Sequence, residues 1–114
     1  MAFGAHTLTH PFLPAMTIEE GENEIKRSKA LIEEKVGKTI KHFAVPNGTR
    51  EDFTPHLKEY CADIGFDTVV TTESGIVSSH ADRYALNRII PPPPLYYFAC
   101  EIARYFFFPK KQEK

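Results

Sequence analysis

The chain has 114 residues, of which 42% are hydrophobic and 25% charged, and its formal net charge is −1. This length is enough for one domain with a buried core, and the composition is ordinary for a globular protein. The small net charge gives no electrostatic argument for binding nucleic acid or an anionic membrane. The sequence contains no evident signal peptide or transmembrane segment, which leaves the compartment unassigned.

The chain opens with a short apolar strand and a loop that carries two histidines. Residues 1–5 are expected to form a strand or the end of one, and the proline-containing stretch 6–13 the loop. His6 and His10 are four residues apart in this loop. Neutral imidazole is the commonest metal ligand in proteins, so such a pair can hold one divalent ion. Spacing alone does not distinguish this from a polar turn with two solvated rings.

A long helix is predicted after the loop. Thr17 and Glu20 have the spacing of a capping box, in which each side chain accepts from the backbone N–H of the other residue. Apolar residues at helical spacing continue to Val36, and Gly37 is a typical stop signal. The charged residues between them are expected to face solvent.

Two further strands enclose a second helix. Residues 40–45 end in an apolar run typical of a buried strand, and residues 46–48 have turn chemistry. Thr54 is the predicted N-cap of a helix that ends at Gly65. Residues 66–71, rich in β-branched side chains, form the next predicted strand.

This alternation predicts an α/β fold with a parallel sheet and flanking helices. Ligands in such folds bind at the C-terminal ends of the strands. The histidine loop, the turn at residues 46–48 and residues 71–73 each follow a predicted strand. We therefore expect these three segments to converge on one rim.

The C-terminal part of the sequence is read as a separate unit. Residues 85–90 could add a fourth strand, and the four prolines 91–94 form an extended spacer that ends the first domain at residue 90. Residues 95–108 then form a strongly aromatic helix in a second unit, 91–114. This helix is expected to pack on the domain or on another subunit, and binding at a membrane interface is the other interpretation.

Three motifs resemble one known family. The segment Gly4-Ala5-His6-Thr7-Leu8-Thr9-His10-Pro11 resembles the second signature of the polysaccharide deacetylases (the NodB homology domain), His-[Ser/Thr]-x-x-His. The apolar run with Pro-x-Gly at residues 43–48 is similar to the third signature. Residues 64–72 are similar to the segment that follows it. The resemblance covers about residues 2–90 in the right order and implies a partial (β/α) barrel.

The resemblance also implies a chemistry. In this family both signature histidines bind a metal, usually zinc, which assigns that role to His6 and His10, and the hydroxyl of Thr7 steadies the loop. A carboxylate is the third ligand, and an aspartate acts as general base. A backbone N–H beside the Pro-x-Gly turn, here that of Asn47, helps to hold the oxyanion. The implied activity is hydrolysis of N-acetyl or O-acetyl groups on a carbohydrate or polysaccharide.

The sequence departs from the family pattern in several places. Nothing in it matches the Thr-Phe-Asp-Asp signature that supplies both aspartates, Ala44 stands where many members have arginine, and His80 lacks the leucine of the late Leu-x-His signature. We therefore expect the C-terminal part of the family domain, with its N-terminal part absent, and these absences put turnover by the isolated chain in doubt. Glu73 is the best substitute for the third ligand, although an exposed loop glutamate is the simpler interpretation.

A partial barrel has a second consequence. Absent neighbouring strands would leave a sheet edge exposed, so self-association through that edge or through the C-terminal helix is expected. The alternative function is a non-catalytic domain that binds carbohydrate or pairs with another subunit. Zinc binding that depends on His6 and His10 would favour the hydrolase over this alternative.

Overall fold

Parallel strands and flanking helices form the part of the chain described by the computed structural model, residues 1–47, 49, 52–89 and 94–107. The strands β1 (His42–Ala44), β2 (Thr68–Ser74) and β3 (Leu86–Arg88) form a sheet in the order β1-β2-β3. The helices are a 3₁₀ turn η1 (Leu13–Ala15), α1 (Ile18–Val36), α2 (Pro55–Asp63) and α3 (Leu95–Phe107). The predicted α/β fold is confirmed.

Both predicted helix starts have the expected caps. The Thr17 side chain accepts from the N–H of Glu20, and the Glu20 carboxylate accepts from the N–H of Thr17, so the capping box is complete. Gly37 ends α1 in the left-handed conformation, at φ 74°. Thr54 caps α2 in the same way as Thr17 caps α1, by accepting from the N–H of Leu57.

All strand pairs are parallel, as predicted. In the pairing of β1 with β2, His42 lies opposite Thr68 and Ala44 opposite Val70. In the pairing of β2 with β3, Val70 lies opposite Leu86 and Ser74 opposite Arg88, and the register is irregular between these two pairs. The predicted first strand was wrong in extent: within residues 1–5, the structure has one isolated parallel bridge, between Ala5 and Phe43. The other residues of this segment are exposed, and without burial on a sheet they lack the stabilisation that a strand needs.

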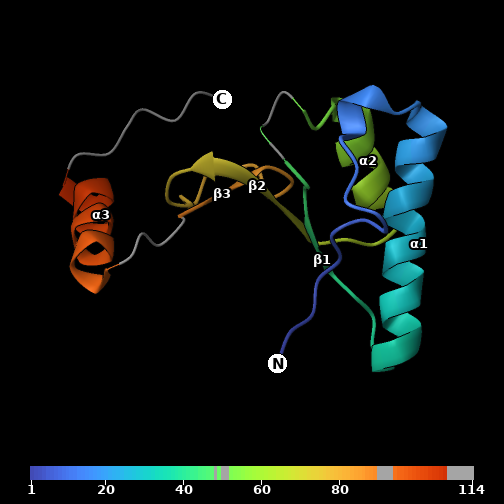
Figure 1. Cartoon of the computed structure of the whole chain (residues 1–114), viewed down its shortest axis with the longest axis horizontal. Helices are drawn as coiled ribbons and strands as arrows, with labels where there is room; N and C mark the ends of the chain where they lie inside the picture. The colour runs from blue at the N-terminus through green and yellow to red at the C-terminus, as the bar shows by residue number, and fades with distance from the viewer. Residues whose placement is uncertain (48, 50–51, 90–93, 108–114) are drawn as a thin grey trace.

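The core lies between the sheet and the helices α1 and α2. Phe43, Phe53 and Phe66 form an aromatic cluster in it, with ring centroids 5.5 Å apart for Phe43 and Phe66 and 6.0 Å apart for Phe43 and Phe53. Figure 1 shows α1 and α2 together at one side of the sheet, and Gly21 of α1 lies beside Leu57 of α2. The aliphatic members of the core are Ala5, Leu13, Ile25, Ile40, Val45, Leu57 and Val69, joined by the buried Cys61.

The aromatic helix lies apart from this core. Figure 1 shows α3 at the other side of the sheet from α1 and α2. Leu95, Tyr96 and Phe106 on it are 79%, 60% and 69% exposed. Of the predicted proline spacer, residues 91–93 lie outside the described residues, as does Phe108 at the predicted helix end. Among the described helices, none is both long and apolar enough to cross a membrane.

Candidate metal centre

The histidine loop is joined to the sheet at β1. The N–H of Ala5 donates to the carbonyl oxygen of His42 at 2.9 Å, and the N–H of Ala44 donates to the carbonyl oxygen of Ala5 at 2.9 Å. His6 therefore leaves the sheet level with the C-terminal end of β1. This is the rim predicted for ligand binding.

The two imidazoles lie side by side. The ring centroids of His6 and His10 are 4.8 Å apart, with an interplanar angle of 66°, and both side chains are exposed. Rings in this arrangement lie close enough to share one ion, which bonds to imidazole nitrogen at about 2.0–2.1 Å when it is zinc.

A backbone hydrogen bond fixes the orientation of the first ring. Nδ1 of His6 lies 2.7 Å from the carbonyl oxygen of Ala44. A carbonyl oxygen can only accept, so Nδ1 carries the proton and Nε2 keeps its lone pair. Histidine ligands in proteins are commonly held by such a bond from the other ring nitrogen.

The loop between the two rings is unusually constrained. Thr7 and His10 have φ values of 67° and 56°, in the left-handed region that residues with a side chain seldom occupy. The Thr7 hydroxyl donates to the carbonyl oxygen of His6 and accepts from the N–H of His10 at 3.2 Å. Thr7 thus steadies the loop by hydrogen bonding, as the family resemblance implied.

Glu24 of α1 also contacts this loop, and the sequence analysis did not single it out. Its carboxylate accepts from the N–H of Leu8 at 2.9 Å and from the N–H of Thr9 at 3.1 Å. Glu24 lies one turn of helix from Gly21 and from Ser28, which are also buried, and beside the buried Ile25, so it belongs to the buried face of α1. A carboxylate on the buried face of a helix requires partners.

Asn47 lies at the turn after β1. It is exposed and has a φ of 51°, and it follows Ala44, the hydrogen-bond partner of His6, by three residues. No acceptor among the described residues pairs with its backbone N–H. Gly48 of the same turn lies outside the described residues.

Within the described ranges, no group of three His, Cys, Asp or Glu residues could hold a metal. Glu73, offered by the sequence as a candidate third ligand beside the simpler interpretation of an exposed loop glutamate, belongs to no such group. Glu73 also lies within β2, which continues to Ser74, rather than in a loop after it. β2 continues because Ser74 pairs with Arg88 of β3. The hydroxyl of the buried Thr71 donates to the carbonyl oxygen of Leu86 and accepts from the N–H of Glu73.

Two other histidines have partners of their own. Nδ1 of His42 lies 2.7 Å from the hydroxyl of Thr68, and Nε2 of His56 lies 2.6 Å from the carboxylate of Glu22. His6 and His10 are therefore the pair that the described structure presents for a metal.

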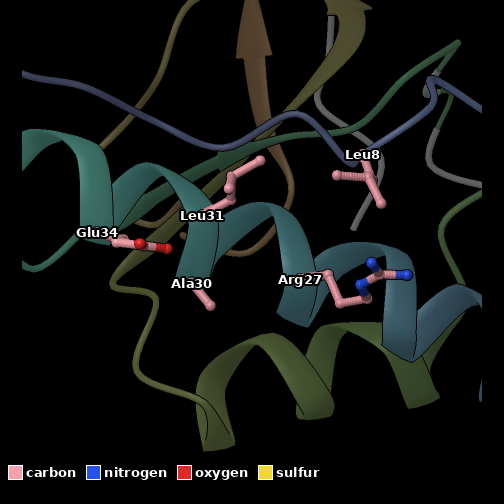
Figure 2. Close-up of a pocket in the computed structure, with 5 residues that line it drawn as sticks. All are labelled: Leu8, Arg27, Ala30, Leu31 and Glu34. Carbon is pink, nitrogen blue, oxygen red and sulfur yellow. The ribbon is translucent and has the colours of Figure 1, made fainter.

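An open pocket of about 240 Å³ lies between α1 and the histidine loop. Figure 2 shows its lining, with Leu8 from the loop above side chains of α1, namely Arg27, Ala30, Leu31 and Glu34. Neither His6 nor His10 lines it, so this pocket is separate from the histidine pair.

Comparisons with known proteins agree with this geometry. The family model described as Polysaccharide deacetylase matches residues 1–69, more than half of the chain. This range contains the histidine loop, β1 and Asn47. No curated protein matches the sequence significantly.

Solved structures match more of the chain. The Streptococcus pyogenes deacetylase PplD, solved in complex with acetate, superposes with a TM-score of 0.70 and 28% identity over 76% of this chain and 37% of its own. BC0361, a polysaccharide deacetylase from Bacillus cereus, superposes with a TM-score of 0.70 and 23% identity, over 87% of this chain and 31% of its own. The chain thus spans about a third of the length of these structures.

Proposed function

The chain belongs to the polysaccharide deacetylase family, and from that premise we propose that it supplies part of a site that removes acetyl groups from a carbohydrate. In this proposal His6 and His10 hold a divalent metal, for which zinc is the first candidate. The backbone N–H of Asn47 would donate to the oxygen of the acetyl carbonyl. The substrate class is an acetylated carbohydrate or polysaccharide.

The donor set is compatible with part of a catalytic zinc site. Such sites have three protein ligands and one water, and the described residues offer two imidazoles. A zinc ion lowers the pKa of its bound water to about 7 and polarises a carbonyl. A carboxylate ligand and a general base would have to come from residues other than the described ones.

One observation carries the proposal. The His6 and His10 rings are 4.8 Å apart, and His6 is hydrogen-bonded at 2.7 Å to the carbonyl oxygen of Ala44, at the end of the strand that leads to Asn47. These two contacts support the proposal because they join the histidine loop to the strand end that precedes Asn47. A polar turn with two solvated rings would not need this connection.

Zinc titration by calorimetry tests the metal-binding part. We expect binding by the wild-type chain and a loss of more than about tenfold in affinity for His6→Ala and for His10→Ala, because each removes one of two ligands. His80→Ala is the matched control, since His80 is an exposed histidine in a distant loop. Wild-type affinity in both loop variants would refute the assignment.

Acetate release tests the hydrolytic part. The chain would be joined to an aspartate-bearing segment of a family member and assayed with zinc on acetylated chitooligosaccharide and on acetylated xylan. Release that is lost in His6→Ala supports the proposal, and absence of release on both substrates counts against it. Asn47→Gly should retain release, because glycine keeps the N–H and tolerates a φ of 51°.

A second function, subunit pairing, is favoured by the exposed apolar residues of α3. Leu95, Tyr96 and Phe106 present large apolar surfaces to solvent, and such patches commonly mark interaction sites. Sedimentation velocity should then show a dimer that dissociates in the double variant Tyr96→Ser, Phe106→Ser. A wild-type chain that stays monomeric at high concentration would exclude pairing through α3.

A further inference from the structure

Glu24 is the buried charged residue that contacts the loop between the two histidines. We propose that it is a positioning residue, which sets the separation of the His6 and His10 rings by holding the backbone between them. The inference rests on the proposed function only where it treats the two rings as metal ligands. The hydrogen bonds from the loop to Glu24 do not require a metal, so they restrain the loop in the metal-free protein as well.

The contacts of Glu24 occupy both carboxylate oxygens. Oε2 accepts from the consecutive N–H groups of Leu8 and Thr9, at 2.9 and 3.1 Å. Oε1 accepts from the hydroxyl of Thr9. Leu8 and Thr9 are two of the three residues between the histidines, so one side chain restrains most of the intervening backbone.

An ionised carboxylate suits these contacts better than an amide would. A carboxylate accepts at both oxygens, whereas glutamine has one acceptor oxygen and an NH₂ group that can only donate. All three contacts at Glu24 come from donors. Glutamine could keep its one oxygen on the two backbone N–H groups only by donating its NH₂ to the Thr9 hydroxyl, and its neutral oxygen makes weaker bonds to those N–H groups than a carboxylate does. Since Glu24 is only 8% exposed, water cannot readily compensate for the weakened bonds.

The loop needs such an external restraint. Thr7 and His10 both have positive φ values, a conformation that persists only where surrounding structure fixes it. Internal bonds of the Thr7 hydroxyl join the two ends of the loop, but they do not tie it to the rest of the domain. Glu24 makes that connection to α1, and the His6–Ala44 hydrogen bond makes one to β1. The ring pair is thus held between a helix and a strand.

Glu24→Gln separates this role from general stability. Amide hydrogen exchange in the metal-free protein should become faster at Leu8 and Thr9, and zinc affinity by calorimetry should fall by about 10–100-fold, the range seen when partners that orient metal ligands are removed. Thr9→Val removes one of the three donors and should weaken zinc binding less than Glu24→Gln. Thr9→Ser keeps the hydroxyl and should restore wild-type affinity.

Glu33→Gln is the matched control. Glu33 lies on the same helix and also accepts from a backbone N–H, that of Ile40 at 2.8 Å, and it pairs with Lys29 at 2.8 Å. Glu33→Gln should lower thermal stability. It should leave both the amide hydrogen exchange at Leu8 and Thr9 and the zinc affinity unchanged. Comparable stability loss in both variants with weaker zinc binding in Glu24→Gln alone supports positioning.

Two results would overturn the inference. One is zinc affinity in Glu24→Gln equal to that of the wild type, and the other is an equal loss in Glu33→Gln. If the wild type itself binds no zinc, the metal assignment of the proposed function fails. Exchange at Leu8 and Thr9 then still decides whether Glu24 holds the loop. Should Glu24→Gln not fold, the Thr9→Val and Thr9→Ser pair provides the same comparison.

Discussion

Nδ1 of His6 lies 2.7 Å from the carbonyl oxygen of Ala44, 38 residues further along the chain. This bond is possible because the Ala5–Phe43 bridge brings the two segments together. It gives the first imidazole one orientation and one tautomer. The geometry of the candidate metal centre therefore depends on the end of β1 as well as on the loop itself.

The tautomer of His6 can be measured directly. Because a carbonyl accepts the Nδ1 hydrogen, we expect nitrogen NMR of the neutral metal-free protein to show a protonated Nδ1 and an unprotonated Nε2, with Nε2 shifting on zinc addition. The exposed His80 should not show this single tautomer. A His6 ring protonated at Nε2 would contradict the hydrogen bond.

Cys61 should resist thiol reagents in the native state. Burial raises the pKa of its thiol to about 12, because the interior disfavours the thiolate, which is the reactive form. Cys100 is exposed, and neither cysteine forms a disulfide. We expect a chromogenic thiol reagent at pH 8 to label one thiol in the native protein and two in urea. Rapid native labelling of Cys61 would show that it is not enclosed.

The same burial makes stability fall at high pH. The thiol has an ordinary pKa of 9.0 when unfolded and about 12 when folded, so above pH 9 the folded state binds more protons than the unfolded state. The stabilisation is fully present below pH 9 and is lost as pH rises toward 12. Cys61→Ala should reduce this loss in urea titrations at pH 9–11. An unchanged pH dependence in the variant would contradict it.

Thr17→Ala should weaken α1 at its first turn. The substitution leaves the N–H of Glu20 without its partner, and losses of this kind cost about 0.5–2 kcal/mol. Thr39→Ala, at an exposed position outside helices and strands, is the control, with an expected change within about 0.5 kcal/mol. Free energies of unfolding from urea titration provide the comparison, and equal values for both variants would show that the cap is unimportant.

Phe43→Ala should be the most damaging single change in the core. Phe43 is 1% exposed and contacts both Phe53 and Phe66, so truncation leaves a cavity and costs about 3–5 kcal/mol. Phe106→Ala removes the same atoms from a side chain that is 69% exposed, and its expected cost is within about 0.5 kcal/mol. Similar urea midpoints for the two variants would place Phe43 outside the core.

Local signals predicted most of the fold. Thr17, Gly37 and Thr54 act through neighbours within a few residues, so their positions in the sequence were sufficient to locate the helix ends. Strand limits depend on distant partners and were less accurate. Residues 1–4 gain no sheet partner, and β2 runs past Thr71 because Ser74 pairs with Arg88 of β3.

The sequence predicted those residues of the candidate site that belong to a recognised motif. The His6–His10 spacing and the family resemblance were enough to expect a ring pair on the rim beside Asn47. Whether that pair binds zinc remains a prediction. Glu24 could not be recognised as a contact of the loop, because its partners at Leu8 and Thr9 are brought near by the packing of α1. Glu73 belongs to no metal-type group among the described residues, and it lies in a strand and not in a loop because β2 continues to Ser74.

The Ala5–Phe43 bridge has a consequence for the order of folding. This contact spans the whole of α1 in the chain, and forming it requires closure of a long loop, whose entropic cost must be met first. We therefore expect the helix and its neighbours to assemble early and the imidazoles to come together late. Zinc added during refolding should then leave the rate of the main phase unchanged and slow only the unfolding reaction.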